Sequence, residues 1–245
     1  MANLVVTTFY KIIDLPEYKD MRAPLIKFCG EQGLRGTILL TPEGVNSTIV
    51  GSRQAVDAFY QYAEATPELA GIEYKETYAQ QWPFQKMKVL LKAEVVAMKA
   101  GPVDMNNRGE YVAGQEWDAL INDPNTVVVD TRNNPEIAFG TFRNAINPNT
   151  EKFSEFAAWA KDYFKDYERD QPIAMFCTYG IRCEKSTAYM KGLGFTKVYH
   201  LHGGIGKYLE ETKNRASMWK GSCFVFDDRL ALDDNLQPIE NAEWA

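Results

Sequence analysis

A chain of 245 residues is long enough for one large domain or two domains of ordinary size. A hydrophobic fraction of 45% and a charged fraction of 24% exclude a disordered or fibrous protein, and no apolar run is long enough to cross a membrane. The net charge of −6 at pH 7 disfavours broad, nonspecific binding to nucleic acid. Four cysteines do not make a disulfide scaffold and the N-terminus lacks signal-peptide features, so we expect a cytoplasmic protein.

The first hundred residues predict a βαββαβ unit. Apolar, β-branched runs indicate strands, at residues 4–13, 36–40, 46–50 and 87–97. Helical patterns occur at residues 16–32 and 53–65, and Ser52 is the expected cap of the second helix. Two βαβ halves of this size are typical of a ferredoxin-like (acylphosphatase-like) α+β sandwich. We therefore expect such a domain over residues 1–100, followed by a Gly-, Pro- and Asn-containing linker at 101–109.

The rest of the sequence alternates strands with helices. Strands are expected at residues 127–130, 172–176 and 197–201, and helices at 115–121, 153–167, 184–191 and 203–211. This alternation predicts an α/β domain over 110–222 with a mainly parallel sheet covered on both faces, followed by an acidic C-terminal tail at 223–245. Reactive groups collect at the carboxyl ends of such strands, where Asp130 and Cys177 are expected.

Cys177 is the strongest candidate for a catalytic residue. It follows an apolar strand directly and begins a short loop that ends at Arg182. Backbone N–H groups of such a loop, the next helix N-terminus and the arginine charge all favour a thiolate with a lowered pKa. The expected anion-binding positions between the two residues are Thr178, Tyr179, Gly180 and Ile181. The alternative is an inert cysteine at the end of a core strand.

The spacing of this loop disfavours a cysteine phosphatase. A phosphatase places arginine six residues after its nucleophile, whereas Arg182 comes five residues after Cys177 and Cys183 occupies the sixth position. A shorter loop suits a sulfur atom or a small anion better than a phosphoryl group. Cys183 either resolves an oxidised or persulfidated Cys177 or packs against the sheet, and Arg132 is expected to brace the loop by an ion pair with Asp130.

Four segments of the second half resemble the rhodanese homology domain in the correct order, at residues 130–132, 140–148, 177–182 and 201–204. More narrowly, the run Cys-Thr-Tyr-Gly-Ile-Arg-Cys-Glu-Lys, the later Phe-Val-Phe-Asp-Asp-Arg and the N-terminal Glu-Gly-Val-Asn resemble the rhodanese-like tRNA uridine hydroxylases. This resemblance covers nearly the whole chain. It implies oxygen-dependent 5-hydroxylation of the wobble uridine, position 34, in the anticodon loop of tRNA. Cys177 then takes the position of the active-site cysteine, where rhodaneses carry a persulfide, and Tyr179 stands where the family commonly has glycine.

Other residues have open interpretations. A basic and aromatic run that includes Lys86 and Lys88, and Lys185 after the loop, are candidates for RNA contacts, and a solvated edge strand is the alternative for the first two. His200 and His202 point to one face of a strand, but no carboxylate stands at ligand spacing, so no metal is expected. No cofactor is evident besides molecular oxygen as co-substrate.

Two further functions remain in view beside the hydroxylase. A plain sulfurtransferase would carry a persulfide on Cys177, and a noncatalytic thiol sensor would use its first domain to bind a partner. For hydroxylation, either Cys177 adds to C6 of uracil and activates C5, with Arg182 stabilising the developing charge, or a persulfide or sulfenate on Cys177 takes part directly.

Overall fold

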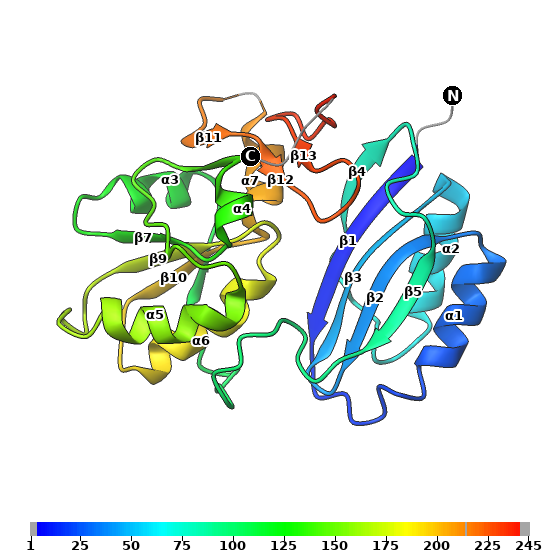
Figure 1. Ribbon diagram of the computed structural model, residues 1–245, viewed down its shortest axis with the longest axis horizontal. Coiled ribbons are helices and arrows are strands. Elements are labelled where there is room, and N and C mark those ends of the chain that lie inside the picture. Colours follow the sequence, from blue (N-terminus) through cyan, green and yellow to red (C-terminus); the bar gives the residue numbers. More distant parts are fainter. Residues whose placement is uncertain (1–3, 214, 241–245) are drawn as a thin grey trace. The chain divides into compact units, whose positions relative to one another are not determined.

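The computed structural model describes residues 4–213 and 215–240 (Figure 1). The chain forms two compact units. Of the described residues, the N-terminal unit comprises 4–97 together with Phe226–Arg229, and the C-terminal unit comprises 98–213, 215–225 and 230–240. Among the described residues, no helix has both the length and the apolar character that crossing a bilayer requires.

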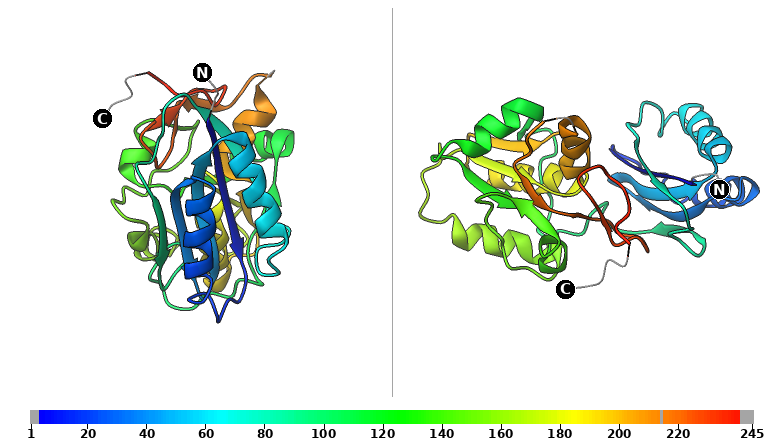
Figure 2. Two further views of the ribbon diagram at one scale, coloured as in Figure 1. Left: turned by 90° about the vertical axis from the view of Figure 1, so that its right-hand side faces the viewer. Right: turned by 90° about the horizontal axis from the view of Figure 1, so that it is seen from above.

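The N-terminal unit is a five-stranded sheet with two helices on one of its faces (Figure 2). Its elements are β1 (Leu4–Ile12), α1 (Arg22–Glu31), β2 (Arg35–Thr41), β3 (Gly44–Gly51), α2 (Arg53–Glu64), β4 (Lys75–Ala79) and β5 (Met87–Leu91). The strand order is β4-β1-β3-β2-β5, antiparallel except for the parallel pair β2 and β5. This order confirms the ferredoxin-like sandwich, with β5 added beside β2. The strand β4 was not predicted, and the last strand ends at Leu91 instead of continuing to residue 97.

Local chemistry explains where the two helices begin. Helix α2 begins after Ser52, whose hydroxyl accepts a hydrogen bond from the Ala55 N–H at 3.2 Å, which confirms the predicted cap. Helix α1 begins at Arg22 and not at residue 16, because Pro24 has no N–H to donate and is tolerated only in the first helical turn. Both helices place apolar side chains on the sheet.

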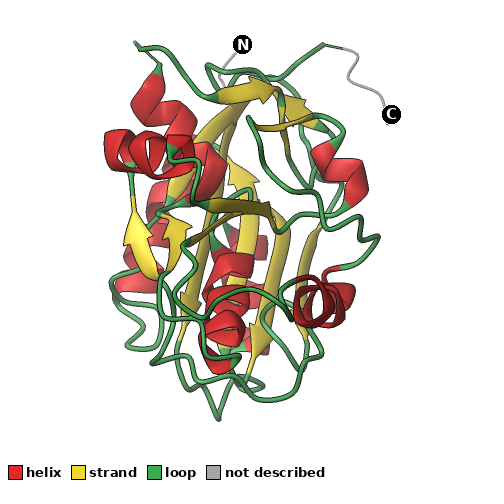
Figure 3. Ribbon diagram, turned by 90° about the vertical axis from the view of Figure 1, so that its left-hand side faces the viewer, coloured by secondary structure: helices red, strands yellow, loops and turns green. Residues whose placement is uncertain are grey.

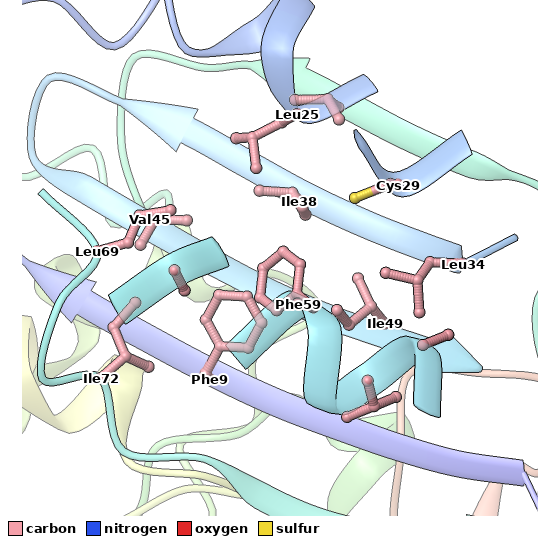
Figure 4. Close-up of a cluster of buried hydrophobic side chains, with 14 of the residues drawn as sticks. Phe9, Leu25, Cys29, Leu34, Ile38, Val45, Ile49, Phe59, Leu69 and Ile72 are labelled. Atoms are coloured by element: carbon pink, nitrogen blue, oxygen red, sulfur yellow. The ribbon is translucent and has the colours of Figure 1, made fainter. Parts of the chain in front are cut away.

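The core of the N-terminal unit lies between the sheet and the two helices (Figure 4). Phe9 of β1 and Phe59 of α2 meet there with ring centroids 5.3 Å apart, and both side chains are fully buried. Cys29 lies in this core, where burial raises the pKa of its thiol to about 12. Cys29 is therefore a structural thiol that stays protonated at neutral pH.

The C-terminal unit is built around a four-stranded parallel sheet. Its helices and strands are β6 (Glu110–Val112), α3 (Gly114–Asn122), β7 (Val127–Asp130), α4 (Asn134–Ile137), β8 (Gly140–Phe142), the 3-10 helix η1 (Phe153–Glu155), α5 (Phe156–Tyr163), β9 (Ile173–Phe176), α6 (Ile181–Gly192), β10 (Val198–Leu201), α7 (Gly204–Thr212), β11 (Trp219–Gly221), β12 (Cys223–Phe224) and β13 (Ala231–Leu232). The central sheet has the order β6-β10-β9-β7. Helices α3 and α7 cover one face and α5 and α6 the other (Figures 1 and 3). The predicted parallel α/β architecture is confirmed.

Part of the segment expected to be an acidic tail, residues 223–245, is folded. Strands β12 and β13 form a short antiparallel pair in the C-terminal unit. The intervening Phe226–Arg229 belongs to the N-terminal unit, where Arg229 pairs with Asp227 at 2.6 Å and donates to the Thr77 hydroxyl at 2.8 Å. Asp227, expected to lie in an acidic tail, is therefore paired with Arg229 in the folded structure.

Candidate active site

The expected site lies at the carboxyl ends of β7 and β9. These strands pair in parallel with Asp130 opposite Phe176, so the residues that follow them, Thr131 and Cys177, emerge at the same edge of the sheet. The Thr131 N–H and hydroxyl both donate to the Phe176 carbonyl, at 3.0 and 2.9 Å. These bonds hold the start of the Cys177 loop against the neighbouring strand.

The environment of Cys177 favours its ionised form. Its side chain is 2% exposed, and its sulfur accepts a hydrogen bond from the Gly180 N–H at 3.1 Å. Burial alone would raise the pKa of the thiol. Hydrogen bonding with the Cys183 side chain, the charge of Arg182 and backbone N–H groups at the start of α6 outweigh burial and lower the pKa of Cys177 to about 6. The surroundings of Cys177 thus stabilise its thiolate.

Helix α7 clamps the loop from the other side. The Ile205 N–H donates to the Cys177 carbonyl and the Gly206 N–H donates to the Thr178 carbonyl, both at 3.0 Å. Gly204 has a φ of 68°, and a Cβ there would lie 2.6 Å from the Cys177 carbonyl oxygen. Only glycine fits this close approach. The sequence predicts a helix start at this glycine, whereas its support of the loop depends on contact with the distant residues Cys177 and Thr178.

The Gly204→Ala substitution should therefore distort the loop. We expect a loss of about 2 kcal/mol or more in the free energy of unfolding and a clear fall in Cys177 reactivity, measured by denaturant unfolding and by alkylation. Gly192→Ala is the matched control, because a Cβ at Gly192 meets nothing within 4 Å. Equal stability and thiol reactivity of the two variants would contradict the clamping role of Gly204.

The loop positions between Cys177 and Arg182 have different surroundings. The Tyr179 ring packs against α7, where a Cβ added to Gly206 would come within 2.5 Å of it. The half-buried Tyr179 ring thus occupies space left by a glycine of the facing helix. Thr178 is 4% exposed, and its hydroxyl finds no hydrogen-bond partner in the described part of the chain. Gly180 has a φ of 98° and precedes the first residue of α6, Ile181.

Arg182 is held by a carboxylate that the sequence analysis missed. Its guanidinium pairs with both carboxylate oxygens of Glu136 on α4, at 2.9 and 3.0 Å. Glu136 is 2% exposed and Arg182 8% exposed, so both charges are buried. No sequence signal pointed to Glu136, because the partners lie 46 positions apart. This bidentate ion pair fixes the plane of the Arg182 guanidinium and therefore the position of its charge relative to Cys177.

Asp130 and Arg132 form a second, fully buried ion pair. Their closest atoms, Oδ2 and Nη2, are 2.6 Å apart, and both side chains have no exposed area. The Thr141 hydroxyl donates to the same carboxylate at 2.8 Å, and Arg132 donates to the Gly140 carbonyl at 2.5 Å. The predicted ion pair is therefore present, and this network ties the end of β7 to β8.

Cys183 is the second cysteine at this site. It is fully buried in the first turn of α6, with its sulfur 3.7 Å from the Thr131 hydroxyl oxygen. Burial and the neighbouring Cys177 sulfur raise the pKa of Cys183 well above its usual value. A thiolate at Cys177 thus stands beside a protonated thiol at Cys183.

Two family models match the chain. The UPF0176 acylphosphatase like domain covers residues 4–95 and the Rhodanese-like domain covers residues 114–211. The tRNA uridine(34) hydroxylase of Anaplasma marginale (strain Florida) is 46% identical over 237 residues, 97% of this chain and 86% of that protein. This chain belongs to the tRNA uridine(34) hydroxylase family.

Other family members match to a similar extent. The tRNA uridine(34) hydroxylase of Anaplasma phagocytophilum (strain HZ) is 47% identical over 240 residues, 98% of this chain and 86% of that protein. The one from Wolbachia pipientis wMel is 47% identical over 236 residues, 96% of this chain and 85% of that protein. The family resemblance inferred from the sequence is thereby confirmed, and the thiolate loop lies within the rhodanese-like domain of this hydroxylase family.

The thiol pKa makes a direct prediction for this family member. Alkylation of Cys177 by iodoacetamide should rise with pH through a midpoint near 6 and level off above it. Burial raises the pKa of Cys29 and of Cys223 to about 12, so both should stay unreactive throughout. Peptide mass spectrometry of protein labelled at each pH measures all three sites. Similar rates for the three cysteines below pH 7 would contradict an activated thiolate.

Not every predicted RNA-binding residue of the hydroxylase reaches the surface. Lys86 and Lys88 are exposed, the latter on the edge strand β5. Lys185 lies on α6 and is 3% exposed, so it is not part of an open basic surface as Lys86 and Lys88 are. Nearby Trp82 stacks under the Arg35 guanidinium at 4.1 Å and packs on a buried cluster, as a structural aromatic would.

The two histidines do not form a metal centre in the described part of the chain. Among these residues no group of three histidine, cysteine or acidic side chains is arranged to hold a metal ion. His200 is fully buried against the Tyr111 ring, with centroids 4.2 Å apart, and burial lowers its pKa to about 4. His202 Nδ1 lies 3.2 Å from the Lys207 ammonium.

Proposed function

We propose that this protein hydroxylates C5 of uridine 34 in the anticodon loop of tRNA, with molecular oxygen as co-substrate and Cys177 as nucleophile. The observation that carries the proposal is the buried Cys177, whose sulfur accepts a hydrogen bond from the Gly180 N–H at 3.1 Å, in a chain of the tRNA uridine(34) hydroxylase family. Four free cysteines suit a reducing compartment, and we propose the cytoplasm.

The chemistry begins with addition of the Cys177 thiolate to C6 of the uracil. This step moves an electron pair to C5 and the C4 carbonyl, which makes C5 a nucleophile toward oxygen. Arg182 keeps the attacking sulfur ionised, while its bond to Glu136 holds it in place. Because Cys177 is only 2% exposed, the uracil has to leave its base stack before it reaches the sulfur.

A sulfurtransferase is the rival function. The same loop that stabilises a Cys177 thiolate would stabilise a persulfide on it, and the Rhodanese-like domain match over residues 114–211 supports this alternative. Sulfur transfer needs neither tRNA nor the N-terminal unit. The match of the acylphosphatase like domain over residues 4–95 therefore favours the hydroxylase.

A paired assay on one preparation separates the two functions. Purified full-length protein is incubated with tRNA lacking the modification, with and without oxygen, and nucleosides are quantified by mass spectrometry. We expect 5-hydroxyuridine only with oxygen and negligible transfer of sulfur from thiosulfate to cyanide. Brisk sulfur transfer with unmodified tRNA would establish the sulfurtransferase instead.

Exposed Lys86 and Lys88 are proposed to contact tRNA phosphates. Replacing both by alanine should weaken tRNA binding and lower the slope of log affinity against log salt by about two. Binding is measured by fluorescence titration at several salt concentrations. The control replaces Lys19 and Lys27 by alanine and removes the same charge. Both are exposed, Lys19 before α1 and Lys27 on it. An equal effect of both double variants would mean that only net charge matters.

A further inference from the structure

The C5 hydroxylation proposed above leaves an electron requirement. One atom of O2 becomes the new hydroxyl group, and the other becomes water only if two electrons and two protons come from another source. Two neighbouring thiols supply both when they become a disulfide. We propose that Cys177 and Cys183 are that source, and that each hydroxylation leaves them joined as a disulfide. This inference rests on the proposed function.

The placement of the two thiols supports a redox pair. Both thiols are buried around Gly180, because Cys177 directly follows β9 and Cys183 stands in the first turn of α6. The Gly180 N–H donates to the Cys177 sulfur at 3.1 Å, and the Gly180 carbonyl accepts from the Cys183 N–H at 3.0 Å. The Thr131 hydroxyl, 3.7 Å from the Cys183 sulfur, orients this thiol from the neighbouring strand. Cys177 and Cys183 are 2% and 0% exposed, so both thiols are shielded from bulk solvent.

The charge on Cys177 is one of the causes that keep Cys183 protonated in the resting protein. Besides burial, the Cys177 sulfur raises the pKa of Cys183. Once Cys177 is bonded to C6 of uracil it carries no charge, so this contribution disappears and Cys183 ionises more readily. Cys183 is thus a poor nucleophile in the resting protein and a better one in the covalent adduct.

The proposed steps balance. Oxygen adds to C5 of the Cys177 adduct and gives a C5 hydroperoxide. The Cys183 thiolate attacks the terminal oxygen and the O–O bond breaks, which gives a Cys183 sulfenic acid and a C5 alkoxide. The alkoxide takes up a proton from water and becomes the C5 hydroxyl group. Loss of the C5 proton then breaks the bond from C6 to Cys177 and releases 5-hydroxyuridine. The freed Cys177 thiolate attacks the sulfur of the Cys183 sulfenic acid and forms the disulfide. The displaced hydroxide takes up a proton and leaves as water.

The other two cysteines are less suited to this role. Cys29 lies in the core of the N-terminal unit, among apolar side chains. Cys223 is fully buried on β12, and its sulfur lies 3.8 Å from the Phe224 carbonyl oxygen. Burial is the main cause that raises the pKa of Cys223 to about 12. Cys223→Ser is therefore a matched control for Cys183→Ser, since both replace a buried thiol of the C-terminal unit.

A single-turnover experiment tests the pair. Full-length protein is reduced, freed of small thiols without oxygen, mixed with excess unmodified tRNA and catalase, and then exposed to oxygen. We expect 5-hydroxyuridine to stop at one per chain, with a Cys177–Cys183 disulfide mapped by proteolysis and mass spectrometry. Addition of dithiothreitol should restart the reaction. Cys183→Ser should form no disulfide and lose about 100-fold in rate, whereas Cys223→Ser should keep the wild-type stoichiometry.

Two results would overturn the proposals separately. If product accumulates beyond one per chain without reductant while Cys177 and Cys183 stay reduced, the redox pair is wrong and the hydroxylase stands. If no 5-hydroxyuridine forms even with oxygen and dithiothreitol, the hydroxylase itself is wrong. Disulfide mapping on the wild type makes the test independent of whether Cys183→Ser folds.

Discussion

The Cys177→Ala variant is expected to lose at least about 10³-fold in the rate of 5-hydroxyuridine formation. The alanine methyl group cannot add to C6 of uracil, so the step that activates C5 is absent and not merely slowed. The rate is measured by mass spectrometry of tRNA nucleosides under reducing conditions. Activity within tenfold of the wild type would mean that Cys177 is not the nucleophile.

The same variant should remain folded. Cys177 is buried, but alanine removes one sulfur atom and also a buried charge, so we expect a change of about 1 kcal/mol or less in unfolding free energy. Thermal unfolding checks this. Cys29→Ala provides the control, because it also removes a buried thiol but lies in the core of the N-terminal unit, and it should retain activity.

The Arg182→Lys variant should lose about 100-fold in kcat/KM although it conserves charge. Lysine cannot bond to both oxygens of Glu136, so its ammonium is not held where the guanidinium acts on Cys177. The thiol pKa of Cys177 should therefore rise, which shifts the midpoint of its alkylation profile upward from about 6.

Combining the two readouts separates positioning from simple charge. Arg143→Lys is the matched control, because Arg143 is exposed in the same unit and its replacement should change neither readout. Full activity and an unshifted alkylation profile in Arg182→Lys would show that Arg182 only neutralises Glu136.

Short-range patterns in the sequence predict much of this fold. Ser52 caps α2 from the position that its side chain predicts, and the alternation of apolar strands with helices predicts the parallel sheet. Two predictions for the N-terminal unit were wrong, the start of its first helix and the number of its strands. Pro24 delays the start of α1, and β4 escapes detection because Lys75–Ala79 is a mostly polar edge strand that the sheet stabilises through β1.

The candidate site shows the same division. The order of strand, cysteine, glycine and arginine is local, so the sequence by itself identified Cys177 and Arg182 and the family resemblance. The pairing of Arg182 with Glu136 and the clamp at Gly204 depend on residues far apart in the chain.

Only the tertiary structure decided those contacts, and it also decided that Cys183 lies beside Cys177 as a protonated thiol and that Lys185 is buried. The physical reason is that burial and close approach arise when parallel strands bring separate loops to one edge of a sheet. Local sequence patterns specify the strands and helices, but they do not specify which side chains meet between them.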